Sequence, residues 1–234
     1  MNELLFFLAV FIDFCFVFLF FHLGVKVGRR LFVGIIINLI LVAVFGGKLI
    51  SLFGFTTNVG NIFYAAVFLG VQLTLEYYGR KDAIRSVWVS FFAVNFFVLM
   101  GQVVLGFQVE PMSGELASAL RVVFGVVPRV TIASLFGLIL SQYANIYIYD
   151  FVRRRVGEAR LWLRSLTAVL VGQLVDSLVF FSIAFLGALE FGTVLQVMIV
   201  GFVIKVLIGV MALPFLHMSR LYAPVIEAER GGIS

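Results

Sequence analysis

Long apolar segments alternate with short polar ones along almost the whole chain. Seven apolar runs cover about residues 4–25, 31–53, 60–78, 84–107, 119–152, 161–187 and 193–216, and a polar tail occupies residues 218–234. A helix needs about 20 apolar residues to cross the hydrocarbon core of a bilayer, so each run is long enough to do so. The pattern predicts an all-α integral membrane protein, a single domain of residues 1–234 built as a bundle of six to seven transmembrane helices.

The fifth run is longer than one span requires. Pro128 lies inside it, and proline removes a backbone donor and clashes with the preceding turn of a helix. We therefore expect Pro128 to kink this run or to end a short half-helix. A polar segment, GFTTNVGN at residues 54–61, predicts a hinge between the second and third runs.

Polar residues interrupt the sixth run near its middle. At 100° per residue, Ser165, Gly172, Gln173 and Asp176 fall on one side of a helix. A charged carboxylate at the bilayer centre costs about 2.5–3.5 kcal/mol, so this side cannot face lipid. The sequence predicts that Asp176 faces a cavity or a partner inside the bundle, and this is the candidate site.

Composition agrees with a membrane protein. Hydrophobic residues make up 63% of the chain and charged residues 12%, and the mean hydropathy is +1.16. So little polar surface cannot cover a soluble globule. The single cysteine, Cys15, excludes an internal disulfide.

The net charge of +5 is explained by the distribution of basic residues rather than by a nucleic-acid partner. Most lysines and arginines fall in alternate connections, at residues 26–30, 80–85 and 153–164, and in the C-terminal tail. Basic connections stay on the cytoplasmic side of a membrane. The N-terminus is therefore expected outside and the C-terminus in the cytoplasm, and the run Arg153–Arg155 is interpreted as a topology anchor that flanks a span.

Further polar residues repeat at helical spacing in other runs. Gln72, Glu76 and Gly79 share a face of the third run, and Lys205 lies in the seventh run at a depth similar to that of Asp176, with which we expect it to pair. The fifth run carries a similar stripe, made of Ser134, Gly137, Ser141 and Asn145 with Gln142 beside it. Such stripes also occur where helices simply pack closely, and Glu76 is near enough to a helix end to be solvated. Both alternatives stay open for these residues.

The sequence contains no motif for soluble catalysis. His22 and His217 are about 200 residues apart, without the spacing of a zinc helix, so no metal site is expected. No phosphate-binding glycine loop and no paired nucleophile and base are found either. We expect no enzyme activity and no cofactor.

Four blocks of sequence, taken in order, resemble a known family. They are KLISLFG (residues 48–54), LEYYGRKDA (75–83), PRVTIASL with SQYAN (128–135 and 141–145), and LWLRS with GQLVDSLVFFSIAF (161–165 and 172–185). Together they resemble the queuosine precursor transporters, also called the vitamin uptake transporter family. The chain departs from that pattern at Gln72 and Asn145, where the family commonly has acidic residues.

The resemblance implies import of a 7-deazapurine base such as 7-cyano-7-deazaguanine, a precursor of queuosine, across a prokaryotic cytoplasmic membrane. A carboxylate, Asp176 or Glu76, would accept two hydrogen bonds from the guanine-like edge of the base. The other expected contacts are Gln72, Gln142, Asn145 and Gln173 as neutral groups, Tyr64 or Tyr143 for stacking, and Arg129 and Lys205 as charge partners of the carboxylates. We expect a carrier that opens to one side at a time.

Two other functions stay open beside this one. The chain would otherwise be the substrate-binding subunit of a multi-component vitamin importer, which needs an energising partner. A third alternative is an intramembrane enzyme or a structural bundle protein. The expected partners are the small-molecule substrate and the lipid bilayer, without nucleic acid, and a homodimer is left open.

Overall fold

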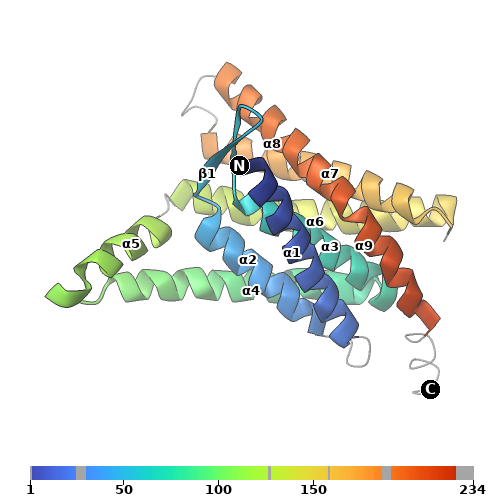
Figure 1. The fold of residues 1–234 in the computed structure, drawn as a ribbon, viewed down its shortest axis with the longest axis horizontal. Coiled ribbons are helices and arrows are strands. Elements are labelled where there is room, and N and C mark those ends of the chain that lie inside the picture. Colours follow the sequence, from blue (N-terminus) through green and yellow to red (C-terminus); the bar gives the residue numbers. More distant parts are fainter. Residues whose placement is uncertain (1, 25–29, 126–127, 158, 186–190, 225–234) are drawn as a thin grey trace.

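The computed structural model describes residues 2–24, 30–125, 128–157, 159–185 and 191–224 (Figure 1). The helices of this part of the chain are α1 (Asn2–Gly24), α2 (Arg30–Phe45), α3 (Gly60–Tyr78), α4 (Arg80–Leu105), α5 (Gly114–Phe124), α6 (Pro128–Val156), α7 (Leu161–Phe185), α8 (Phe191–Met211) and α9 (Leu213–Met218). The strands are β1 (Leu49–Leu52) and β2 (Phe55–Asn58), and single 3-10 turns cover Pro111–Ser113 and Ser219–Tyr222.

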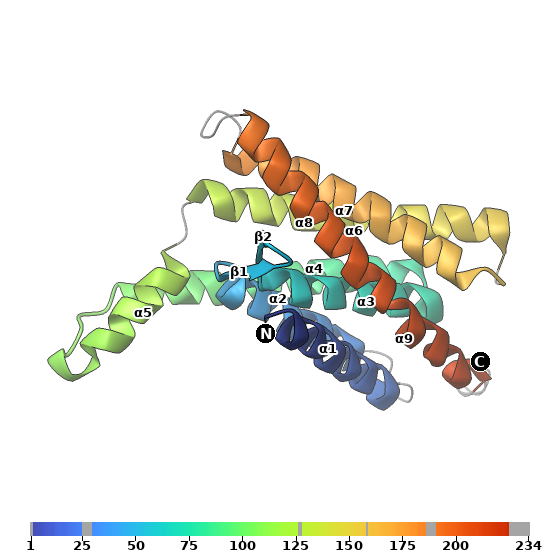
Figure 2. The same cartoon turned by 45° about the horizontal axis from the view of Figure 1, so that its top comes forward.

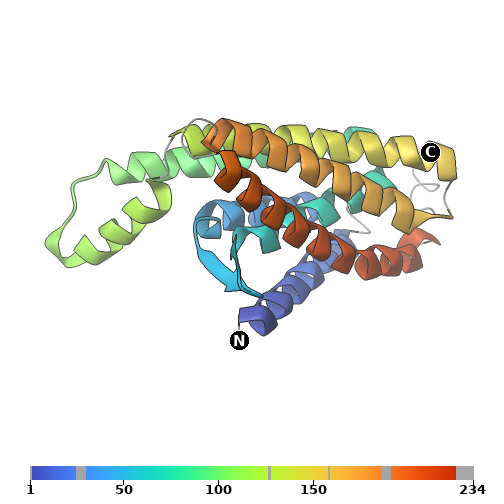
Figure 3. The same ribbon diagram turned by 90° about the horizontal axis from the view of Figure 1, so that it is seen from above.

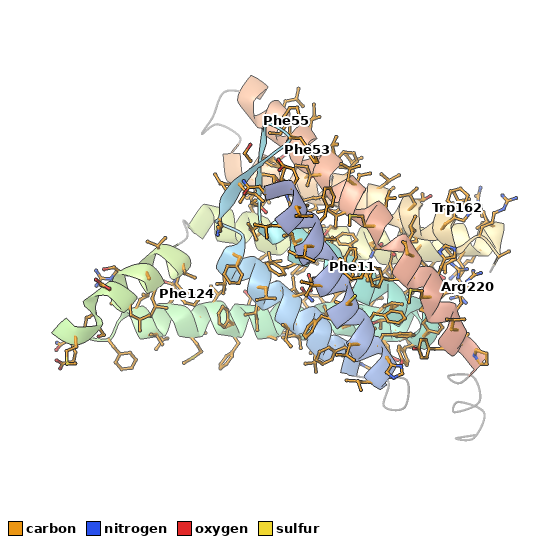
Figure 4. All side chains as sticks on the ribbon, viewed as in Figure 1. Phe11, Phe53, Phe55, Phe124, Trp162 and Arg220 are labelled. Carbon is orange, nitrogen blue, oxygen red and sulfur yellow. The ribbon has the colours of Figure 1, made fainter. Side chains whose placement is uncertain are left out.

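Long apolar helices confirm the predicted all-α membrane class. Four helical segments of the described chain are long and apolar enough to cross a bilayer, namely Asn2–Gly24, Arg80–Leu105, Leu161–Ile183 and Met198–Tyr222. Large apolar side chains on their outer faces are exposed, as Phe11 on α1 shows (Figure 4). Lipid is the solvent that such faces require. The total of six to seven spans stays a prediction.

The second apolar run is not one helix. α2 ends at Phe45, before Gly46 and Gly47, and β1 and β2 form an antiparallel hairpin in which Leu52 faces Phe55. The two loop residues, Phe53 and Gly54, have φ values of +52° and +82°, as a tight hairpin turn requires. The prediction of a span over residues 31–53 was therefore wrong at its C-terminal end, because a short apolar strand cannot be told from a helix by composition.

The fifth apolar run is divided into two helices. α5 ends at Phe124, and α6 begins with Pro128, a position at which the missing backbone donor of proline carries no cost. This confirms the short half-helix that was one of the two expectations for Pro128. In Figure 1, α5 projects with the end of α4 away from the remaining helices. None of its residues is buried.

α3 is the central helix of the bundle. Sixteen of its 19 residues are buried, which exceeds what a helix with one lipid-facing side allows. Figures 2 and 3 show α1 and α2 on one side of α3, and the adjacent pair α6 and α7 on the other. α3 therefore presents two opposite faces, each with its own set of partners.

A single residue, Gly79, joins α3 to α4. Its φ of +85° and ψ of 174° lie in a region that is open to glycine and strained for side chains with a Cβ atom. The turn therefore needs glycine, and it places the start of α4 directly against the end of α3.

Close contact between α6 and α7 depends on small residues. A Cβ atom on Gly172 of α7 would lie 2.7 Å from Phe68 Cε1 and 3.1 Å from the backbone oxygen of Ser141. On α6, a Cβ atom on Gly137 would lie 2.9 Å from Asp176 Oδ1. Gly137 thus faces Asp176 while Ser141 faces Gly172, so the two helices run antiparallel.

Substitution Gly172→Ala is expected to lower the free energy of unfolding by about 1–3 kcal/mol, because the added methyl group overpacks this contact. Gly201→Ala in α8 is the matched control, since no atom of another described part of the chain lies within 4 Å of the position of its Cβ. Thermal unfolding of the purified protein in detergent measures both changes. Equal unfolding temperatures for the two variants would contradict the tight packing of α6 on α7.

Candidate functional site

One face of α3 carries a functional or bulky side chain on every turn. Tyr64, Phe68, Gln72 and Glu76 follow one another at intervals of four residues, so they line up along the helix. On α6, Ser141, Asn145 and Tyr149 repeat at the same interval. α3 lies against α6 and α7, and these side chains meet there in successive layers.

The first polar layer surrounds Asp176 of α7. Lys205 Nζ of α8 donates to Asp176 Oδ2 at 2.5 Å, and the Tyr64 hydroxyl donates to Asp176 Oδ1 at 2.8 Å. The Tyr64 oxygen also lies 2.8 Å from Ser141 Oγ, which itself donates to the Leu138 backbone oxygen. Asp176 is 7% exposed. The structure confirms the predicted ion pair between Asp176 and Lys205, and it joins α3, α6, α7 and α8 at one point.

The second polar layer is a set of hydrogen bonds around the side-chain amide of Gln72. Its Nε2 donates to Asn145 Oδ1 and to the Ser165 backbone oxygen, each at 3.1 Å. Its Oε1 accepts from Ser165 Oγ at 2.6 Å. Gln72 is 1% exposed, and both the nitrogen and the oxygen of its amide have hydrogen-bond partners. In this structure Gln72 therefore holds α3 to α6 and α7.

The third polar layer neutralises Glu76. Arg164 NH2 of α7 donates to Glu76 Oε1, the Tyr149 hydroxyl of α6 donates to Oε2 at 2.8 Å, and Arg153 lies 3.9 Å from the same oxygen. Arg164 is fully buried, and the Glu76 side chain is 9% exposed. The alternative of a solvated Glu76 was therefore wrong, because two arginines and a tyrosine take the place of water.

Unpartnered polar atoms lie beside these layers. Both side-chain atoms of Gln142, the Oε1 of Gln173, the Oγ of Ser177 and the Nδ2 of Asn145 are buried and have no hydrogen-bond partner among the described residues. Buried polar groups in proteins are nearly always paired, so each orphan atom needs an explanation such as a ligand or water.

The side chains of Gln142 and Gln173, which carry three of these orphan atoms, lie in the same region of the fold. Gln142 follows Ser141 and Gln173 follows Gly172, the two residues at which α6 and α7 touch. Because the helices run antiparallel, the next residue on each turns to the same side of the pair. That side is the one on which α3 packs, since Tyr64 contacts both Ser141 and Asp176. The two amides therefore flank α3 near the Asp176 layer.

One of the expected residues, Tyr143, lies elsewhere, and another falls outside the described side chains. Tyr143 turns its hydroxyl to α4, where it accepts from Trp88 Nε1 at 2.9 Å, and its ring stacks on Tyr147. The side chain of Arg129 lies outside the described part of the chain. Sequence reasoning missed Tyr149 and the use of Tyr64 as a donor to Asp176, although the four-residue spacing of Tyr64, Gln72 and Glu76 was a signal for a shared face.

Comparison with known proteins places the chain in a family. The sequence model described as "Putative vitamin uptake transporter" matches residues 58–219, which contain all three polar layers. A relative in Bacillus subtilis (strain 168), named "Probable queuosine precursor transporter", is 34% identical over 179 residues, which cover 76% of this chain and 77% of the relative. The "Queuosine precursor transporter" of Escherichia coli (strain K12) is 29% identical over 136 residues, 58% of each chain.

No solved structure matches the chain. The two sequence relatives and the family model agree with each other and with the resemblance noted in the sequence, and the model match covers the last three of its four blocks. A multi-pass helical bundle with a buried polar centre is also what a membrane transporter requires. The chain belongs to the vitamin uptake transporter family, the family of the queuosine precursor transporters.

Proposed function

We propose that this protein imports a queuosine precursor, a 7-deazapurine base such as 7-cyano-7-deazaguanine, by alternating access around Asp176. The names of the two relatives support the substrate class. The observation that carries the proposal is the buried Asp176 carboxylate with the unpartnered amide of Gln142 and the unpartnered Oε1 of Gln173 near it. Together these groups offer the charge and the amides that a planar, hydrogen-bonding base would need.

Asp176 suits the recognition of a guanine-like edge better than Glu76 does. Such an edge offers N1–H and an exocyclic amine, and one carboxylate accepts both in parallel hydrogen bonds. Both Glu76 oxygens are already held by Arg164 and Tyr149, whereas the partners of Asp176 are one lysine and one tyrosine on separate helices. Release of Lys205 or Tyr64 would free a carboxylate oxygen for the base.

The remaining residues fall into two groups, those that would contact the base and those that link the helices. The orphan donors, Gln142 Nε2 and Asn145 Nδ2, would contact the carbonyl and the acceptor ring nitrogen of the base, and the orphan acceptors, Gln142 Oε1 and Gln173 Oε1, would accept from its N–H groups. Gln72 and Glu76 hold the three helices together in this state. Lys205 balances the charge of Asp176 when no base is bound.

The basic connections support an orientation with the C-terminus in the cytoplasm and the N-terminus outside. Arg80, at the start of α4, lies 3.8 Å from Asp150 near the end of α6, and its guanidinium stacks on Tyr147. The basic α3–α4 and α6–α7 connections therefore lie at the same end of the bundle, as the positive-inside rule requires of cytoplasmic loops.

Uptake of labelled 7-cyano-7-deazaguanine tests the proposal. Cells that neither synthesise nor otherwise import the base are expected to accumulate it when they produce this chain, and excess unlabelled 7-deazaguanines should compete while adenine should not. Asp82→Asn, which removes an exposed carboxylate paired with Arg85, is the control and should transport normally. Absence of uptake by a well-folded protein present in the membrane would reject this substrate class.

A further inference from the structure

The middle of α1 carries a buried acid that the substrate centre does not use. Asp13 is 7% exposed and lies on the buried stripe of α1 with Val10, Phe14 and Val17. It is 11 residues from each end of the helix, about 17 Å at 1.5 Å per residue. If α1 spans the membrane, Asp13 lies near the bilayer centre.

Asp13 and Asp176 lie on opposite sides of α3. α1 and α2 pack on the α3 face that contains Gly70, where a Cβ atom would lie 2.7 Å from Ile35 Cγ1 and 3.7 Å from Val17 Cγ1. The face that contacts Asp176 is that of Tyr64 and Gln72. Figures 2 and 3 show the same division of the helices. The Asp13 carboxyl is therefore a separate site.

The neighbour of Asp13 on α2 is Asn38. Its side chain lies beside the Asp13 carboxyl and is completely buried. Asn38 Nδ2 donates to the Gly34 backbone oxygen at 3.0 Å. Two oxygens in this pair, Asp13 Oδ2 and Asn38 Oδ1, have no hydrogen-bond partner in the described chain. Both oxygens are acceptors while Asp13 is ionised, so neither can donate to the other.

No charged group among the described residues balances Asp13. The titratable groups of α1 and of the elements packed on it and on α2 lie at helix ends, face outward or have partners of their own. They are Glu3, Cys15, His22, Tyr64, Glu76, Tyr77, Tyr78, Arg80, Lys81, Asp82, Arg85, Glu115, Arg121, His217, Arg220 and Tyr222. The side chain of Arg30 lies outside the described residues. Asp13 thus differs from Asp176, which has Lys205.

An ionised carboxylate without a counter-charge is costly in this position. Ionised aspartates are unfavourable at the centre of a membrane helix, and buried carboxyls commonly avoid this cost by binding a proton. A proton on Asp13 Oδ2 also creates the missing donor, because the resulting O–H group can donate to Asn38 Oδ1. One proton therefore removes the charge and gives both orphan oxygens a partner.

We propose that Asp13 is a proton-binding site, that its protonated carboxyl donates to Asn38, and that loading and release of this proton drive transport. A metal cation fits less well, because even Mg²⁺ takes six ligands and the buried neighbours Val10, Phe14 and Val17 are apolar. The proton-binding step stands on the geometry of α1 and α2 alone, and the coupling step rests on the proposed import.

Infrared difference spectroscopy of the protein in lipid vesicles tests proton binding directly. The parent protein is expected to show the carbonyl stretch of a protonated carboxyl, which disappears at high pH and is missing in Asp13→Asn. Asp82→Asn, an exposed carboxylate in an ion pair, should keep the band. A band of unchanged intensity in Asp13→Asn would overturn the site.

Proteoliposomes that carry a proton gradient test the coupling. The parent is expected to accumulate labelled 7-cyano-7-deazaguanine above the external concentration until a protonophore is added. Asp13→Asn should still exchange labelled for unlabelled base, but its accumulation should fall to that of the parent with protonophore. Parent-like accumulation by Asp13→Asn would overturn the coupling. A parent that neither exchanges nor accumulates this base would instead reject the import proposal, while the infrared result would still decide the proton site.

Discussion

Asp176→Asn is expected to reduce uptake of the deazapurine by up to about a hundredfold. The variant keeps one acceptor oxygen but loses the charge and one charge-assisted hydrogen bond to the base, worth up to about 3 kcal/mol, and each 1.4 kcal/mol is a factor of ten. Initial uptake rates at matched membrane expression measure the effect. The reduction should appear at every substrate concentration below saturation.

Asp176→Asn is also expected to lose stability, because Lys205 loses its counter-charge. A double variant separates this loss of stability from the loss of substrate binding. In Asp176→Asn the Lys205 ammonium stays at 12% exposure without its counter-charge, and breaking a buried pair in this way costs about 3–5 kcal/mol of stability. The double variant Asp176→Asn with Lys205→Met removes both charges and should recover much of the stability. Recovery of uptake together with stability would contradict the role of Asp176 in binding the base.

Arg164→Met is expected to be among the most destabilising single substitutions in the described chain. Arg164 is fully buried, and it donates to Glu76, to the Tyr149 hydroxyl and to the Gly157 backbone oxygen. Among the described residues, its loss leaves Glu76 with Arg153, 3.9 Å away, as its counter-charge, at a cost of about 3–5 kcal/mol. Thermal unfolding in detergent, followed by the loss of the monodisperse peak in size-exclusion chromatography, measures the effect.

Two companion variants show whether charge balance is the cause. Arg164→Met with Glu76→Gln removes both charges and should unfold at a higher temperature than Arg164→Met alone. Arg154→Met, which removes an arginine that is 73% exposed in its side chain, should change stability by less than about 1 kcal/mol. If Arg154→Met and Arg164→Met unfold at the same temperature, the third polar layer does not stabilise the bundle.

The sequence predicted those features that the bilayer itself dictates. Hydropathy alone gave the helical membrane class, and the shared depth of Asp176 and Lys205 predicted their ion pair, because two charges in hydrocarbon have few alternatives to pairing. The position of Pro128 predicted a division of the fifth run. Each of these inferences uses the distance along one helix and the cost of polar groups in lipid.

Features that depend on which helix faces meet were beyond the sequence. Gln72 and Glu76 were expected to contact the substrate, which stays a prediction, but the sequence did not show which residues of α6 and α7 bind them. These are Asn145, Ser165, Tyr149 and Arg164. Helical spacing shows that residues share a face, but it does not show the residues opposite that face. The hairpin of β1 and β2 was missed for a different reason, since four apolar residues in a strand continue the hydropathy of α2.

The one-residue turn at Gly79 has a mechanical consequence. α3 ends at Tyr78 and α4 begins at Arg80, so the two helices share a joint with only two free backbone dihedrals. α3 supplies Tyr64, Gln72 and Glu76 to the three polar layers. Any tilt of α3 that exchanges these partners must therefore move α4 as well. A change at the polar centre is thereby transmitted along α4 to the projecting α5.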